Sequence, residues 1–351
     1  MIGSFERGDL ETWRYGSAYA ASASDPSRVL RDAKAVVCVA VAYGAEPPPN
    51  RPPLTGRVSN YAWPQDYHAT LRGLLLELAS TIDAYAGAPA TKIACDTAPL
   101  AERARAAQAG VGWIGKHTNL ISPAAGSYVF LGEIVTTVPL AADPPVKKSC
   151  GSCARCVAAC PTGALRGDYT IDARRCISDL VQRTGPIPRA MRPLVGDWVW
   201  GCDLCQIVCP PTQQAAGSRL SPFGAPAHES AYPDLIALLH LKSAEYRRRY
   251  RRSAIGWRGA AVLRRNAAIV LGNLLDRAAV PDLSRALGSD PHPMVRGAAA
   301  WALGRIASPP ALEALRAAAR TESDADVLSE ISSASRGNVE PPPERSPLEP
   351  M

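Results

Sequence analysis

The hydrophobic pattern divides the chain into an α/β part, a cysteine-rich part and a helical part. Residues 34–43 form a β-branched apolar run, which predicts a buried strand. Across residues 66–86, apolar side chains recur at helical spacing. Two further strands are expected at 91–96 and 127–140. Because strands and helices alternate, we predict an α/β domain over residues 1–145.

The end of the strand at 91–96 carries the first candidate for chemistry. Asp96 stands where the strand ends and a loop begins, shortly before Pro99. A carboxyl group at such a position is able to donate a proton to a ligand. It is equally able to cap the helix that Pro99 opens and Gly110 closes. Residue types alone favour the cap, so both interpretations stay open.

Residues 110–115 match the glycine spacing G-x-G-x-x-G of a dinucleotide-binding loop. That loop requires a strand before it and a helix after it, whereas residues 102–109 are themselves expected to be helical. We therefore reject a dinucleotide site. Glycines here allow the backbone to pass close to a large ligand or to another element. Lys116 and His117 would stand beside that passage, or in a solvated loop.

The C-terminal part is helical and repeats itself. Residues 266–273 and 297–305 are two similar Ala-rich segments, each with Leu-Gly near its end. Two helices per unit predict a short HEAT-like repeat within residues 241–331, although a plain helical bundle also suits such a composition. Residues 213–240 are interpreted as a connector, and 332–351 as a disordered tail.

Composition places the chain among ordinary globular proteins. Of 351 residues, 47% are hydrophobic and 20% are charged, which excludes a disordered chain, a coiled coil and a collagen. The N-terminal residues lack the basic and apolar regions of a signal peptide. The longest apolar run falls far short of the ~20 residues that span a bilayer. We therefore expect a cytoplasmic protein, without a membrane partner.

Eight of the ten cysteines lie within the segment 146–212. In a reducing compartment, metal ligation explains such a group better than disulfides do. The first four cysteines and a following proline form the C-x2-C-x2-C-x3-C-P run of bacterial ferredoxins, in which the fourth cysteine binds the other of two [4Fe–4S] clusters. A second group contains C-x2-C-x3-C-P, with one more cysteine upstream.

The ferredoxin pattern predicts that the two groups of cysteines interleave. One cluster is expected on Cys150, Cys153, Cys156 and Cys209. The other cluster is expected on Cys160, Cys176, Cys202 and Cys205. Two structural zinc sites are the alternative, but the cysteine–proline endings favour iron–sulfur. The remaining two thiols, Cys38 and Cys95, are expected to serve packing.

Positive charge is concentrated in one stretch. Residues 242–265 hold nine basic residues and one acidic residue, whereas the whole chain has a net charge of only +7. A local excess of this kind indicates a polyanion site, and the interleaved Tyr246, Tyr250 and Trp257 would be able to stack on bases. A solvated basic face or a membrane-surface patch is the alternative.

Several segments together resemble the epoxyqueuosine reductase family, over roughly residues 30–330. These are DYH (66–68), CDTAPLAERARAAQAGVGWIGKHTNLI (95–121), GSYVFLGEIVT (126–136), CGSCARCVAACPTGAL (150–165), CIS (176–178), GCDLCQIVCP (201–210) and RRNAAIVLGN (264–273). The resemblance implies an α/β cobalamin-binding domain, a ferredoxin-like domain with two [4Fe–4S] clusters, and C-terminal HEAT-like repeats. It also implies a longer N-terminal α/β region than the residues before Lys34 provide.

The resemblance further implies reduction of epoxyqueuosine to queuosine at the wobble position of tRNAs with a GUN anticodon. Electrons would pass from a donor such as flavodoxin or ferredoxin through the clusters to cobalamin, with Asp96 as proton donor. Besides Asp96, the implied cobalamin-lining residues are Leu120, Leu131, Ser178, Cys202 and Asp203. The implied tRNA contacts are Arg258, Arg264, Arg265 and Asn266. The sequence itself lacks a D-x-H-x-x-G cobalamin signature.

Three other functions remain open from the residues alone. The first is a cobalamin and iron–sulfur reductase of a small molecule such as an organohalide. The second is a non-catalytic electron-transfer protein, and the third is a zinc-bound module that binds nucleic acid. A small substrate needs neither the basic stretch nor the helical repeat, which favours a tRNA substrate. We expect the protein to be a monomer.

Overall fold

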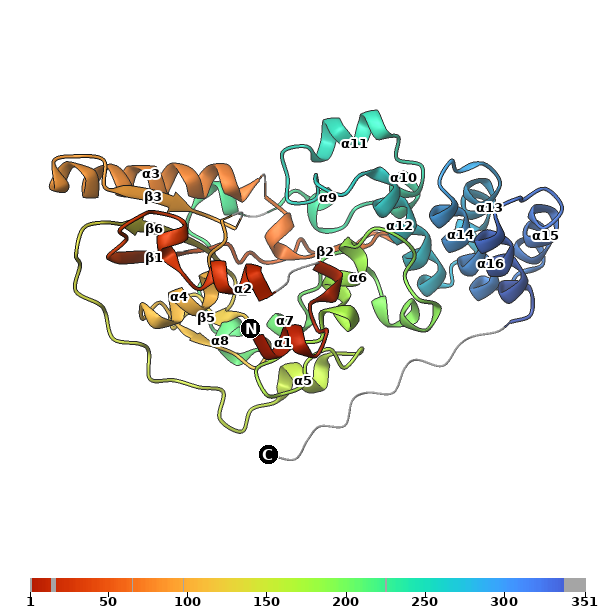
Figure 1. The fold of residues 1–351 in the computed structure, drawn as a ribbon. Helices are drawn as coiled ribbons and strands as arrows, with labels where there is room; N and C mark the ends of the chain where they lie inside the picture. The colour runs from red at the N-terminus through yellow and green to blue at the C-terminus, as the bar shows by residue number, and fades with distance from the viewer. Residues whose placement is uncertain (1, 14–16, 65, 97, 225, 338–351) are drawn as a thin grey trace.

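The computed structural model describes residues 2–13, 17–64, 66–96, 98–224 and 226–337 (Figure 1). The α/β part lies at one end of the molecule and the helical repeat at the other, with the cysteine-rich part between and below them. No helix in the described ranges is both long and apolar enough to cross a bilayer.

A three-stranded sheet forms the centre of the α/β part. Its strands are β1 (Ala35–Ala42), β6 (Val129–Thr136) and β3 (Thr91–Ala94), in the order β1-β6-β3. The central strand β6 runs antiparallel to both neighbours, so that Glu133 lies opposite Cys38 on one side and Ala94 on the other. The three strands predicted from the apolar runs are confirmed, each with slightly trimmed ends.

One helix covers each face of this sheet. The predicted long helix is α3 (Tyr67–Ala86), whose buried Leu71 and Leu75 pack against Gly132. Helix α4 (Glu102–Gln108) lies on the opposite face. Its N-cap is Ala101, so Asp96 does not cap it, and the cap interpretation of Asp96 is wrong.

The remaining short elements complete the α/β and cysteine-rich parts. The α/β part also contains α1 (Ile2–Glu6), α2 (Ser17–Ala23), β2 (Arg57–Val58), β4 (Trp113–Ile114) and β5 (Leu120–Ile121). The cysteine-rich part contains α5 (Arg155–Ala159), α6 (Ile177–Gln182), β7 (Trp198–Trp200), α7 (Leu204–Ile207) and α8 (Pro210–Gln213). Strand β2 pairs with β7 in parallel, which joins the two parts.

The residues that follow form the helical part. Its elements are α9 (His228–Ala231), α10 (Leu235–Leu239), α11 (Ser243–Tyr250), α12 (Ala260–Leu274), α13 (Val280–Ser289), α14 (Pro293–Ile306), α15 (Pro309–Ala318) and α16 (Ala325–Ser335). Because α16 runs through Ser335, the predicted disordered tail does not begin at residue 332. Residues 338–351 of that tail lie outside the described residues.

Equivalent glycines explain the internal repeat. Gly272 of α12 lies directly against Ala302 of α14, and Gly304 of α14 lies in the same way against Ala334 of α16. Absence of a side chain at each glycine allows the successive helices to approach closely. The predicted HEAT-like repeat is therefore present, and its Leu-Gly pairs mark the contacts between units.

The largest apolar core crosses the predicted domain boundaries. Leu180 of α6 and Trp200 of β7 are fully buried in one cluster with Leu235 of α10 and Leu271 of α12. The cysteine-rich part therefore shares a core with the helical part, and does not depend on metal alone for its packing. Helix α10, at the end of the predicted connector, belongs to this core.

The glycine contacts in the repeat generate a stability prediction. A Cβ at Gly272 would lie 2.8 Å from Ala302 Cα, a backbone atom that moves only if α14 shifts. Gly272→Ala should therefore destabilise the protein by about 1–3 kcal/mol. Gly288→Ala is the matched control, since nothing lies within 4 Å there and alanine should stabilise the helix by about 0.5–1 kcal/mol. Urea unfolding followed by circular dichroism measures the stability of both variants. Equal unfolding midpoints for Gly272→Ala and Gly288→Ala would contradict the close packing of α12 on α14.

Candidate active site and cluster-binding region

All ten cysteines are free thiols, and the eight in the cysteine-rich part form two groups. In the first group, burial together with the nearby Cys150, Cys209 and Cys153 raises the pKa of Cys156 to about 11. Burial also raises the pKa of Cys209, as do Cys150 and Cys153. Cys209 thus lies with the first three cysteines, although Cys205 precedes it closely in sequence.

The second group contains the other four cysteines. Burial raises the pKa of Cys176 to about 11, and neighbouring Cys160 adds to the shift. Burial raises the pKa of Cys202 well above its usual range, with Cys176 and Cys205 contributing. Membership of both groups is the same as in the predicted interleaved assignment. Within the described ranges, no three His, Cys, Asp or Glu side chains converge on a position for a single metal ion.

A cavity of about 620 Å³ lies where the α/β part meets the cysteine-rich part. Its volume falls within the usual range of ligand pockets, 300–1,000 Å³. All six residues that the family resemblance implies for cobalamin line it. They are Asp96, Leu120, Leu131, Ser178, Cys202 and Asp203. Three cysteines of the second group, Cys176, Cys202 and Cys205, also line this cavity, so the predicted acid and the predicted cluster face the same space.

Aromatic side chains form one wall of the cavity. Tyr67 stacks on Phe130 with ring centres 4.0 Å apart, and Tyr43 stacks on Phe130 at 4.2 Å. Tyr61 lies nearby and accepts a hydrogen bond from Trp200 Nε1 at 2.9 Å. Burial raises the pKa of each of these tyrosines, so all three hydroxyls stay neutral.

His117 supplies an unpartnered polar atom in the same cavity. Lys116 and His117 are each only 2% exposed, so the solvated-loop interpretation is wrong. The Nδ1 atom of His117 accepts the Asn119 backbone N–H at 3.2 Å, while Nε2 has no hydrogen-bond partner among the described residues. Burial lowers the pKa of His117 to about 4, and the neutral ring therefore carries its proton on Nε2. This donor suits a ligand with acceptor atoms at its edge.

The three glycines beside His117 have a structural role. Gly110 and Gly112 lie between α4 and β4, and Gly115 lies in the hairpin loop between β4 and β5, so the segment does not connect a strand to a helix. A Cβ at Gly112 would collide with the backbone of Ile121, and one at Gly115 would lie 2.9 Å from His117 Cε1. The rejection of a dinucleotide-binding loop is confirmed, and the glycines permit the close approach that places His117.

Asp96 lies at the mouth of the cavity in a left-handed backbone conformation, with φ of 54°. Its side chain is 58% exposed, and Oδ2 lies 3.1 Å from Nε2 of His68. The other ring nitrogen of His68 lies 2.5 Å from Asp66. The hydrogen bond with Asp96, together with Asp66, raises the pKa of His68 to about 9, so a charged imidazolium holds Asp96 in place.

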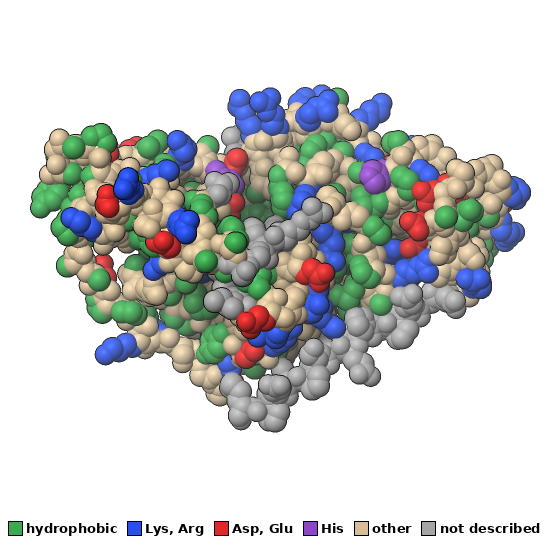
Figure 2. All heavy atoms as spheres, viewed as in Figure 1, with side chains coloured by type: hydrophobic (Ala, Val, Ile, Leu, Met, Phe, Trp, Pro, Cys, Tyr) green, Lys and Arg blue, Asp and Glu red, His purple; other side chains and the backbone are tan. Residues whose placement is uncertain are grey.

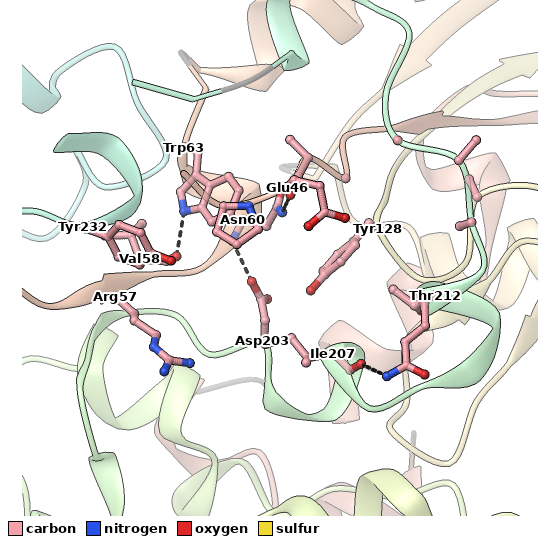
Figure 3. A pocket seen from close by; sticks show the side chains of 18 of the residues that line it. Glu46, Arg57, Val58, Asn60, Trp63, Tyr128, Asp203, Ile207, Thr212 and Tyr232 are labelled. Carbon is pink, nitrogen blue, oxygen red and sulfur yellow. Dashed lines mark hydrogen bonds between the residues drawn. The ribbon is translucent and has the colours of Figure 1, made fainter. Parts of the chain in front are cut away.

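Asp203 lines both this cavity and a second one of about 480 Å³, which Figure 3 shows from close by. Its carboxylate accepts hydrogen bonds from Ser59 Oγ at 2.6 Å and from the Asn60 backbone N–H at 2.7 Å. Sequence neighbours line opposite cavities, with Ser59 in the larger and Asn60 in the smaller. Through these two hydrogen bonds, Asp203 holds together residues that line the two cavities.

Comparisons with known proteins identify the family. Residues 24–97 match the family model described as "Epoxyqueuosine reductase QueG, DUF1730", residues 149–212 the "4Fe-4S double cluster binding domain" and residues 259–335 "HEAT repeats". An epoxyqueuosine reductase of Bacillus anthracis is 36% identical over 312 residues, covering 88% of this chain and 82% of the relative. The Bacillus subtilis enzyme is 36% identical over 310 residues, covering 87% and 80%. The chain belongs to the epoxyqueuosine reductase family.

Solved structures of epoxyqueuosine reductases share the whole fold. One contains a tRNA-Tyr epoxyqueuosine-modified stem loop and is 34% identical, with a TM-score of 0.86 over 93% of this chain and 89% of that chain. A Bacillus subtilis structure, described with its catalytic loop swung out of the active site, is 32% identical, with a TM-score of 0.88 over 96% and 90%. This member of the family is an oxidoreductase with a 4Fe–4S double cluster binding domain, which decides against zinc.

Three of the four predicted tRNA contacts are placed inside the protein. Arg264 forms an ion pair with Asp290 at 2.7 Å. Arg265, 1% exposed, donates to backbone carbonyls of α6 and the residues after it. Asn266, 0% exposed, donates to the carbonyl of Val181 at 2.7 Å and to that of Val199 in β7 at 2.8 Å. As direct contacts with a polyanion these three predictions are wrong, because their donors are used within the protein.

The exposed basic surface lies on α11 and the residues after it, where Lys and Arg gather in Figure 2. We call this surface the α11 face. Its exposed arginines are Arg247, Arg248, Arg249, Arg251 and Arg252. Tyr246 is buried and donates to the carbonyl of Ile255, so it is unable to stack on a base. Trp257 is 51% exposed and stacks with half-buried Arg258, whose guanidinium carbon lies 3.6 Å from the ring centre.

Sequence reasoning missed Glu102, which lines the cavity beside Asp96 and accepts its backbone N–H. Sequence reasoning also missed the fully buried Glu133 on β6. A signal for Glu133 was available, because a lone carboxyl in an otherwise apolar strand is costly to bury and usually has a purpose. For Glu102 no comparable signal exists, since an acidic residue in the first turn of a helix is common.

The interleaved cysteine groups generate a prediction about iron content. Cys153→Ala combined with Cys209→Ala should remove one cluster and leave about half of the iron, because both thiols belong to one group. Cys205→Ala combined with Cys209→Ala removes one ligand from each group, so this variant should lose nearly all of the iron. Iron and acid-labile sulfide in anaerobically purified protein are the measurements, with Cys38→Ala as the control. Equal iron in the two double variants would contradict the interleaving.

Proposed function

We propose that this chain reduces the epoxide of epoxyqueuosine to the alkene of queuosine, at the wobble position of tRNA in the cytoplasm. The observation that carries the proposal is the single cavity that Asp96 shares with the second group of cysteines. Conversion of an epoxide to an alkene requires two electrons and loss of the oxygen as water. A carboxyl group and an electron-transfer centre facing one space supply both requirements.

The cavity residues fit cobalamin as the group that receives the electrons. Leu120 and Leu131 offer apolar contact, while Ser178 and the unpartnered Nε2 of His117 offer hydrogen bonds at the rim. When bound, cobalamin supplies a strongly reducing cobalt centre, and the clusters supply single electrons. We infer that the external donor is a one-electron carrier such as flavodoxin or ferredoxin.

The chain's own residues position the substrate and move its proton. Asp96 would donate a proton to the epoxide oxygen, which leaves poorly without one. The imidazolium of His68 would hold the Asp96 side chain toward the cavity mouth through the 3.1 Å contact. The aromatic wall of Tyr43, Tyr67 and Phe130 would exclude water from the reacting carbons.

We assign tRNA binding to the α11 face and to Trp257, in place of the buried Arg264, Arg265 and Asn266. Exposed arginines suit phosphates, and an exposed indole suits a base or a sugar. Arg258 remains a candidate contact because its stacked guanidinium is only half buried. The relative solved with a modified stem loop supports tRNA as the partner.

The role of Asp96 is tested by Asp96→Asn. This variant should bind tRNA, iron and cobalamin normally but lose about 10²–10⁴-fold in the rate of queuosine formation, because the amide has no acidic proton. Asp32→Asn is the matched control, since Asp32 is also exposed and left-handed, with φ of 61°. Nucleoside analysis of tRNA from an epoxide-accumulating strain measures the product, and wild-type turnover by Asp96→Asn would remove Asp96 from the mechanism.

The α11 face is tested by replacing Arg247, Arg248 and Arg251 together with Gln. Affinity for modified tRNA should fall, and the slope of log affinity against log salt should flatten by about 0.7–0.9 for each phosphate that the variant no longer neutralises. Replacing three exposed arginines elsewhere, at Arg277, Arg316 and Arg320, controls for total charge. Binding titrations at several salt concentrations give both numbers. If both triple variants show the same slope, the α11 face does not bind tRNA.

A further inference from the structure

The proposed reaction consumes two protons for each epoxide. Two electrons from the one-electron carrier break the two C–O bonds and form the alkene, and the oxygen takes up two protons to leave as water. Asp96 carries a single acidic proton, so the second must reach the oxygen by another route. Two further carboxyl groups are used by no step above: Glu102 lines the cavity, and Glu133 is fully buried in the neighbouring sheet.

Glu102 lies between Asp96 and the protein interior. It begins α4 and lines the same cavity as Asp96. One of its carboxylate oxygens accepts the backbone N–H of Asp96, so the loop that carries Asp96 is joined directly to this carboxyl group. Both side chains line the cavity, so a proton is able to pass between them through water that enters it.

Glu133 lies in strand β6 of the sheet that α4 covers. Side chains alternate along β6, so Glu133 shares a face with Leu131, which lines the cavity about 7 Å away along the strand. Glu133 is 0% exposed, and neither carboxylate oxygen has a hydrogen-bond partner among the described residues. An ionised carboxylate without water or a partner is very costly, so this geometry stores a neutral acid.

Electrostatics place the three carboxyl groups in series. Burial, with the neighbouring charge of Glu102 adding to it, raises the pKa of Glu133 to about 9. Burial raises the pKa of Glu102 to about 7, a shift that the Asp96 N–H opposes and the Asp96 charge supports. The other ionisable groups around the pair are Cys38, Tyr67, Cys95, Arg103, Arg105 and His68. Neutral Glu133 is therefore the deepest proton store, and Glu102 is balanced between its two forms.

We propose that Glu102 and Glu133 form a proton reserve that reloads Asp96 during one turnover. The inference rests on the proposed function. After Asp96 gives its proton to the oxygen, Glu102 passes a proton to the Asp96 carboxylate and regains one from Glu133. Ionisation of the buried Glu133 is uphill, so it is transient, and the departure of the oxygen as water draws the transfer forward. Asp96 then delivers the second proton, water leaves, and solvent later reprotonates Glu133. Both glutamates act through Asp96, and neither touches the substrate.

The store itself is tested without substrate, by infrared spectroscopy of the holoprotein at neutral pH. The wild-type protein should show the C=O stretch of a buried carboxylic acid, with a small shift in D₂O. Glu133→Gln should weaken this band, because half-neutral Glu102 still contributes to it, and the exposed matched control Glu77→Gln should leave its intensity unchanged. Absence of the band in the wild type, or a band of full wild-type intensity in Glu133→Gln, would overturn the proposal.

The transfer is tested by Glu102→Gln under single-turnover conditions. Glutamine keeps an acceptor for the Asp96 N–H but carries no acidic proton, so a merely structural role predicts wild-type rates. The proton reserve predicts a fall of about 10²-fold in rate, with unchanged tRNA affinity. Glu133→Gln should behave similarly. If Glu133→Gln fails to fold, the infrared band of the wild type and the single-turnover rate of Glu102→Gln still test the proton reserve.

The outcomes separate the two proposals. Full activity in Asp96→Asn would reject the proposed role of Asp96. Loss of activity in Asp96→Asn, combined with wild-type single-turnover rates in Glu102→Gln and Glu133→Gln, would reject the proton reserve alone.

Discussion

A buried guanidinium and the amide next to it hold the working parts of the molecule together. Arg265 of α12 donates to carbonyls at the end of α6, and Asn266 donates to carbonyls of both α6 and β7. Burial lowers the pKa of Arg265 to about 9, a cost that these hydrogen bonds offset. Helix α6 follows Cys176, and β7 leads to Cys202, so this pair of residues places two cysteines at the cavity.

The site depends on this arrangement because no single part of the chain contains it. Strand β7 pairs with β2 of the α/β part while its other contacts reach α12. One wall of the cavity therefore presents cysteines, and the opposite wall presents Asp96 and Glu102. A shift of α12 would change the separation of these walls, although α12 itself lies outside the cavity.

Local patterns in the sequence were sufficient for the elements and for the cysteine chemistry. The apolar runs predicted β1, β3, β6 and α3, and the recurring Leu-Gly pairs predicted the helical repeat. The family resemblance failed for Arg264, Arg265 and Asn266 as direct tRNA contacts, because it assigned them without regard to the residues that surround them. These residues stand within an apolar helix, AAVLRRNAAIVLGNL, where a charged side chain must face a buried partner. The arginines of α11 have no such surroundings and remain exposed.

Longer-range relations could not be read from local pattern. A lone glutamate in VFLGEIVT indicates an unusual buried group, but its neighbour is decided by the helix that covers that face of the sheet. Helix α4 brings Glu102 there, between Glu133 and the loop of Asp96. Electrons would then enter the cavity from the cysteine wall and protons from the sheet wall. Separate entry keeps the acid groups out of direct contact with the cluster thiolates, which need to stay deprotonated to bind iron.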